Sequence, residues 1–213
     1  MATKVVDEID LDEEPPPLRK MTCKSTDCGN NLHCFQQDKQ NSKPVPGGKC
    51  RDCGVDLVDW SRIHKRDSRD SAYTFSKLRV EMIRHKYFHQ VLTERERNYA
   101  LKKGRVEMRL VAEKRIRNSV GAAQPFKDGA QTPWEGKGKT HAILFYAQHA
   151  TACCCRTCIA EWHGIPAGRE LTTDEIGYLT DLVCMYVGER VPELTENGVG
   201  IPAIRTKKPP PKG

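Results

Sequence analysis

The sequence predicts a mainly helical α+β protein, in which a small N-terminal zinc-knuckle module precedes a C-terminal Cys/His domain with one buried strand. Three observations lead to this prediction. The 10 cysteines form two groups, one within residues 21–60 and one within residues 141–191. The charged block between the groups repeats its apolar residues with the period of a helix. One uninterrupted apolar run, at 141–148, has the length of a strand.

Composition limits the class of protein. The chain has 213 residues, of which 38% are hydrophobic and 30% charged, enough for a small core in one or two domains. No apolar run approaches the roughly 20 residues of a membrane helix. The first twenty residues carry six acids and no apolar signal segment. We therefore expect a cytoplasmic protein with no membrane partner, whose clustered cysteines are reduced and suited to metal.

Changes in composition along the chain suggest five regions. The two ends are rich in charge and proline, which disfavours a packed core. We expect a disordered acidic tail over 1–20, a zinc-knuckle module over 21–60, a basic helical region over 61–118, a Cys/His metal-binding domain over 119–194, and a disordered basic proline-rich tail over 195–213.

Two close cysteine pairs define the N-terminal module. The pairs Cys23/Cys28 and Cys50/Cys53 are separated by 21 residues, and a glycine follows Cys28 and Cys53. Glycine suits a metal knuckle because the residue after the second thiolate often needs a positive φ. Four thiolates close a tetrahedral zinc shell with no open position, which is the structural type of site.

Two neighbouring residues are alternative ligands for this first site. His33 and Cys34 lie between the two pairs, although neither belongs to a knuckle. Unliganded thiols are the other interpretation of the same residues.

The basic block predicts three helices. The first covers residues 73–92, where Val80, Ile83 and Tyr87 follow the 3.6-residue period. The second runs from Thr93, a good N-cap, to Lys103 before a C-capping glycine. In residues 105–120, the apolar residues Val106, Met108 and Leu110 alternate with polar ones, as in a strand. The many Arg and Glu residues and the four-residue spacing of Ala112 and Ile116 favour a third helix instead.

The charge of this block suggests a partner. Residues 61–118 contain 17 Lys/Arg against 7 Asp/Glu, a net charge of +10 that exceeds the +7 of the whole chain. Clustered cations attract phosphates, so DNA or RNA is a possible partner, bound through its backbone more than its bases. The alternative is an ordinary solvated helix surface.

Two histidines of the basic block lie four residues apart. His85 and His89 therefore share one helix face and could hold zinc. The other interpretation is that they only lie at the edge of that face.

The C-terminal region predicts a strand and two helices. The run at 141–148 is assigned to the buried strand, and residues 156–163 to a short helix. A longer helix begins at Thr172 or Thr173, because the acids Asp174 and Glu175 then occupy its first turn. Cys184 on that helix is expected to be a plain core thiol.

The stretch HATACCCRTCIAEWH, residues 149–163, predicts a second metal site. Cys155 and Cys158 form a knuckle at the start of the short helix. Two thiolates with two imidazoles can complete a zinc shell, and so can three thiolates with one imidazole. The candidate ligands are therefore His149, Cys154, Cys155, Cys158 and His163.

Three other chemistries compete at this second site. An iron–sulfur cluster also takes cysteine ligands. A redox Cys-x-x-Cys would need an adjoining βαβ unit. Catalytic zinc would need an open position and a general acid or base, for which Glu161 is close in sequence.

Residues 128–176 closely resemble a family of small bacterial proteins known as a domain of unknown function, DUF4186. The resemblance covers about residues 95–190 and leaves the N-terminal cysteines outside. It implies that Cys153 is an additional cysteine and that the three later ones are shared, but it implies no reaction. The matching motifs are His149-Ala150-Thr151, Cys154-Cys155-Arg156, Cys158, Trp162-His163-Gly164-Ile165-Pro166 and Gly168.

These observations favour a zinc-binding protein of bacterial or phage origin that acts as a nucleic-acid-associated accessory or regulatory factor, and not as an enzyme. One alternative is a metal-dependent hydrolase or nuclease that uses the C-terminal site. Another is a protein–protein adaptor whose two zinc ions only hold the fold.

Overall fold

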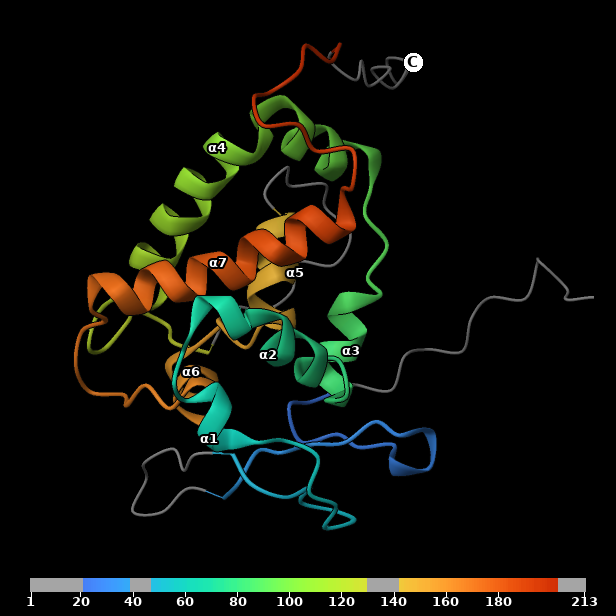
Figure 1. Cartoon of the computed structure of the whole chain (residues 1–213), viewed down its shortest axis with the longest axis vertical. Helices are drawn as coiled ribbons and strands as arrows, with labels where there is room; N and C mark the ends of the chain where they lie inside the picture. Colours follow the sequence, from blue (N-terminus) through green and yellow to red (C-terminus); the bar gives the residue numbers. More distant parts are fainter. Residues whose placement is uncertain (1–20, 39–46, 130–141, 203–213) are drawn as a thin grey trace, which may run out of the picture.

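The computed structural model describes residues 21–38, 47–129 and 142–202 of the chain, which fold as a mainly helical protein (Figure 1). The predicted acidic tail 1–20 lies outside the described residues, as do residues 203–213 of the predicted basic tail. The segment at 130–141, which includes the first residue of the expected strand, also lies outside them.

The helices surround a short central helix, α5. Helix α7 packs across α4 and α5, and α5 also contacts α3 (Figure 1). The elements in chain order are η1 (Cys28–Asn30), α1 (Trp60–Ile63), η2 (Ser68–Asp70), α2 (Ser71–Leu78), α3 (Met82–Phe88), α4 (Glu94–Val120), α5 (Ala142–Ala150), α6 (Arg156–His163) and α7 (Thr173–Arg190).

Capping residues fix the starts of the two long helices, as the sequence predicts. Thr93 caps α4 and Thr172 caps α7, each through a complete capping box with the glutamate three residues later. Each box satisfies backbone N–H groups that the first turn leaves without a partner inside the helix. The predicted short helix at 156–163 is also confirmed as α6.

The expected single helix over 73–92 is wrong, because the chain forms α2 and α3 with a break between them. His33 of the N-terminal segment pairs with the backbone at this break. Its N–H donates to the carbonyl of Val80, and the N–H of Met82 donates to its carbonyl, both at 2.8 Å. The break therefore provides a strand-like edge that holds the N-terminal segment in place.

The predicted buried strand at 141–148 is also wrong, because its described residues belong to helix α5, Ala142–Ala150. A short apolar run cannot distinguish a buried strand from a buried helix by its period. Helices α3, α4 and α7 all contact α5, so most of its circumference is covered and apolar residues suit almost every position. The described residues contain only isolated bridges, Asp27 with Leu32 and His33 with Glu81, and no extended strand.

Gly104 breaks α4 at the position where the sequence predicts a helix end. It adopts φ 67° and ψ 178°, and the helix continues beyond it, so the second and third predicted helices are confirmed. Residues 195–199, the first part of the predicted C-terminal tail, lie against this break (Figure 1). Arg105 N–H donates to Thr195 at 2.9 Å, and Val199 N–H donates to Leu101 at 3.0 Å.

Replacing Gly104 with alanine is expected to destabilise the protein. Its backbone conformation is essentially restricted to glycine and costs about 1–3 kcal/mol for another residue. A Cβ would also lie 2.3 Å from the Asn197 carbonyl carbon, so the tail segment would have to move. Urea unfolding should show this loss. Gly177→Ala, inside α7 with no neighbour within 4 Å of the added Cβ, should instead stabilise by about 1 kcal/mol. Equal effects of the two substitutions would contradict this account.

Aromatic rings join the N-terminal segment to helix α6. The ring centroids of Phe35 and Trp162 lie 5.9 Å apart and those of Trp60 and Trp162 lie 5.1 Å apart, with edge-on geometry. Across the described part of the chain, the buried apolar side chains from Phe35 to Leu194 form a continuous core. The cysteine-containing N-terminal segment is thus packed onto the helices.

Within the described ranges, no helix is both long and apolar enough to cross a membrane.

Candidate metal centre

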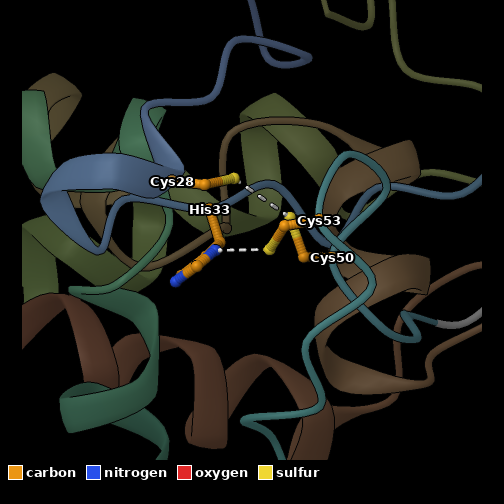
Figure 2. A group of neighbouring side chains, drawn as sticks. All are labelled: Cys28, His33, Cys50 and Cys53. Carbon is orange, nitrogen blue, oxygen red and sulfur yellow. Dashed lines mark hydrogen bonds between the residues drawn. The ribbon is translucent and has the colours of Figure 1, made fainter.

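Four side chains from two loops converge to form the first candidate centre (Figure 2). The ligand atoms of Cys28, His33, Cys50 and Cys53 all lie within 4.8 Å of one another. Cys28 Sγ and Cys50 Sγ are 3.8 Å apart, and Cys53 Sγ is 3.5 Å from His33 Nδ1. We call this group the N-terminal site.

The backbone around the N-terminal site turns twice. Cys50 N–H donates to the carbonyl of Val55, and Gly54 N–H donates to the carbonyl of Cys50, both at 2.9 Å. Gly54 has φ 74°, as the sequence predicts for the residue after a knuckle. Gly29 does not adopt a positive φ, and Asn31, with φ 58°, takes the left-handed position after η1 instead.

A neighbouring amide orients the histidine of this site. Nε2 of His33 lies 3.0 Å from Asn31 Oδ1, so the Nε2–H tautomer donates to the amide oxygen. Nδ1 then keeps its lone pair and faces Cys53. A histidine that ligates a metal almost always donates its second ring N–H to such a partner.

Backbone dipoles favour a thiolate in the N-terminal site. Burial alone would raise the pKa of Cys50, but backbone hydrogen bonds at Cys34, Cys53 and Asp52, with the His33 ring, lower that pKa to about 6. A thiolate is the form of cysteine that binds metal.

Cys23, which the sequence assigns to the first site, lies elsewhere. Its carbonyl accepts a hydrogen bond from Cys34 Sγ at 3.1 Å. Interaction with the side chain of Cys158, together with burial, raises the pKa of the Cys23 thiol. The structure therefore brings together Cys28, Cys50 and Cys53 of the predicted ligands, adds His33, and leaves Cys23 outside.

The second candidate centre lies at the N-terminus of α6. The sulfurs of Cys154, Cys155 and Cys158 lie within 4.8 Å of one another, and we call them the C-terminal cluster. Cys155 is the N-cap of α6, and its Sγ accepts from Cys158 N–H at 3.3 Å. The backbone N–H of Arg156, the first residue of α6, donates to the carboxylate of Asp128 at 3.0 Å. The knuckle is thus held by the first turn of the helix.

A buried arginine contacts the C-terminal cluster. Nη2 of Arg84 lies 3.0 Å from Cys158 Sγ and its Nη1 lies 3.7 Å from Cys154 Sγ. Its Nε donates to Glu81 at 3.0 Å, and both members of this ion pair are only 2% exposed. Trp162 Nε1–H donates to the same carboxylate at 2.7 Å.

The two predicted histidine ligands are not part of the C-terminal cluster. His163 is fully buried, with Nε2 3.0 Å from the carbonyl of Thr151 and Nδ1 3.3 Å from the hydroxyl of Tyr178. His149 lies beside the ring of Tyr87, and its Nδ1 is 3.0 Å from the carbonyl of Phe145. Burial lowers the pKa of both histidines to about 4, so both are neutral at pH 7.

Of the three buried charged residues around the C-terminal cluster, sequence reasoning finds Glu161 and misses Arg84 and Glu81. Arg84 and Glu81 look like ordinary members of a basic helix in sequence. The one signal is their three-residue spacing, which suits an ion pair but says nothing of burial. Glu161 is buried and accepts from Gln36 at 3.1 Å, and desolvation, aided by the charge of Cys158, raises its pKa to about 7.

Taken together, the two groups of side chains could hold two metal ions. Their donors are thiolate sulfur and imidazole nitrogen, which zinc and other soft or borderline metals prefer. Neither group offers the oxygen ligands that calcium or magnesium needs.

Comparison with known proteins identifies the family of this chain. A search of solved structures found no match. The family model described as a domain of unknown function (DUF4186) matches residues 72–188, more than half of the chain, and begins earlier than the expected residue 95. The N-terminal cysteines lie outside the match, as predicted. The chain therefore belongs to the DUF4186 family.

Proposed function

We propose that this is a zinc-binding protein whose bound ions stabilise the fold. The geometry of the N-terminal site carries the proposal. Tetrahedral zinc, with Zn–S near 2.3 Å and Zn–N near 2.0–2.1 Å, separates two sulfurs by about 3.8 Å and a sulfur and a nitrogen by about 3.5 Å. The two separations found here are 3.8 Å and 3.5 Å.

The surrounding segment supports a structural role. In the described residues between 21 and 59, the only helical element is η1, Cys28–Asn30. Such a segment has little regular hydrogen bonding of its own, and a structural zinc site supplies roughly 10–16 kcal/mol of binding free energy. Four protein ligands leave no position for a substrate.

Metal analysis of the purified protein tests this proposal. We expect zinc, and no iron, in the wild type, and one ion fewer per chain in Cys28→Ser. Cys184→Ser is the matched control, because Cys184 belongs to neither group, and it should keep the wild-type zinc content. An unchanged zinc content in Cys28→Ser would refute the N-terminal site.

Association with DNA or RNA is a second candidate function, favoured by exposed cations on α4. Lys102, Arg105 and Lys114 are exposed and form no ion pair with any described residue. Several arginines of the basic block pair with carboxylates outside it, so its available positive charge is smaller than +10. These pairs include Arg79–Glu189, Arg97–Glu193 and Arg109–Asp181. The pairs within the block, such as Arg62–Asp70, Arg69–Asp67 and Arg117–Glu113, are already counted in that net charge.

Salt-dependent binding tests the second candidate. If the three exposed cations bind phosphates, affinity for duplex DNA should fall steeply with salt. Replacing all three with alanine should reduce the slope by about 0.9 for each phosphate that is no longer neutralised. Fluorescence anisotropy with labelled DNA and RNA measures this. Lys49→Ala, an exposed lysine away from α4, serves as the control. No binding at low salt would eliminate nucleic acid as a partner.

A further inference from the structure

We propose that Cys23 completes the C-terminal cluster, so that Cys23, Cys154, Cys155 and Cys158 form a closed four-thiolate zinc site. The inference rests on the proposed function, since it takes zinc as the bound metal. It moves Cys23 from the site that its sequence position suggests to one built about 130 residues away.

Position is the first argument. A side-chain interaction links the Cys23 thiol to Cys158, and the charges of Cys155 and Arg84 act on it as well, although its sulfur is not among the three that all lie within 4.8 Å of one another. The backbone holds it there: Cys34 Sγ donates to its carbonyl, and the turn from Thr22 to Ser25 is closed by a 3.1 Å backbone hydrogen bond. The N-terminal segment thus delivers one sulfur to a cluster that otherwise has three.

Charge is the second argument. The guanidinium of Arg84 is buried, and only one carboxylate, that of Glu81, pairs with it among the described residues. Its remaining donors point at Cys158, Cys154 and the carbonyl of His149. Guanidinium donation to sulfur is strong when the sulfur is a thiolate. A four-thiolate zinc centre carries a net negative charge, which this arginine partly offsets.

Coordination number is the third argument. Within residues 72–188, the part that matches the family, the cluster has three sulfurs. Three protein ligands with an open fourth position are the pattern of catalytic zinc. Neither nearby histidine belongs to this group of ligand atoms, and His163 already engages both ring nitrogens in other contacts. Cys23, from outside the matched region, closes the shell, which makes this second ion structural as well.

The two sites are consequently interleaved. Cys23 serves the C-terminal cluster, whereas Cys28, five residues later, serves the N-terminal site. The two ions together fasten the segment 21–38 to helix α6 and to the loop at 50–53. Loss of either ion should therefore loosen the same segment.

Zinc retention in matched cysteine variants tests the inference. After dialysis against a moderate chelator, wild type and Cys184→Ser should keep two zinc ions per chain, and Cys23→Ser should keep one. Cys184 is the control because it is a free cysteine that belongs to neither group. Cys28→Ser should also keep one ion, having emptied the N-terminal site.

A second measurement covers the case in which water replaces the missing sulfur. In cobalt-substituted protein, sulfur-to-cobalt charge-transfer absorption grows with the number of bound thiolates. Cys23→Ser should lose at least one of seven thiolate contributions, whereas Cys184→Ser should lose none. If Cys23→Ser matches the control in both zinc content and charge transfer, the inference is overturned. That result, with the expected loss in Cys28→Ser, would leave the proposed function standing; no loss in Cys28→Ser would refute the proposed function itself.

Discussion

Cys50→Ser is expected to empty the N-terminal site and unfold the segment around it. Cys50 is 3% exposed and supplies the central sulfur of the site, 3.8 Å from Cys28. Zinc binding in such sites contributes roughly 10–16 kcal/mol, which rivals the roughly 5–15 kcal/mol that separates folded from unfolded protein. The segment has almost no regular secondary structure to compensate for this loss.

Hydrogen exchange resolves this effect along the chain. Amides such as those of Cys50 and Gly54, which are hydrogen-bonded in the wild type, should exchange at nearly the rate of an unfolded chain in the variant. Helices α4 and α7, which pack on each other, should keep most of their protection. Cys184→Ser should match the wild type throughout. Protection of Cys50→Ser equal to that of the control would show that the site does not hold the segment.

Arg84→Met is expected to cost about 3–5 kcal/mol, the usual effect of removing one partner of a buried ion pair. The substitution leaves the carboxylate of Glu81, 2% exposed, without its cation. It also removes two donors from the sulfurs of the C-terminal cluster. In a chain of this size the melting temperature should fall by roughly 6–20 °C.

Thermal unfolding of the zinc-loaded protein checks this expectation. Arg97→Met is the matched control, because Arg97 pairs with Glu193 at an exposed site where an ion pair contributes about 0–1 kcal/mol. Adding Glu81→Gln to Arg84→Met should recover part of the loss, since the amide oxygen still accepts from Trp162 and carries no charge. Equal effects of Arg84→Met and Arg97→Met would mean that the buried pair is energetically unimportant.

Local signals explain which parts of the fold are predictable from sequence. Thr93, Thr172 and Gly104 act within a few residues of themselves, through capping hydrogen bonds or backbone conformation. Helix starts and the break in α4 are therefore correctly predicted. The break between α2 and α3 is not, because it depends on His33, a residue distant in sequence that pairs with the chain there.

The same distinction applies to α5. Several helices contact it, and its less buried face also carries the apolar residues Phe145 and Tyr146, so the sequence lacks the periodicity that separates a helix from a strand. The neighbours that decide the question lie far away in sequence, so the strand prediction fails for lack of tertiary information.

The ligand sets show the limit most clearly. Sequence proximity pairs Cys23 with Cys28, yet the turn at residues 22–25 directs Cys23 to another part of the molecule. His33 takes its place in the N-terminal site, although its position between the cysteine pairs makes it only an alternative ligand in sequence. Counting offers one signal: three cysteines leave a four-ligand zinc shell one donor short, and neither nearby histidine joins their group.

X-ray absorption at the zinc edge of the wild-type protein tests the central claim most directly. The account predicts two zinc ions per chain that share seven sulfurs, at about 2.3 Å, and one imidazole nitrogen, with no oxygen in either shell. Spectra that require a water or carboxylate oxygen at one ion would contradict the claim, because that ion would then have a ligand other than the four protein side chains.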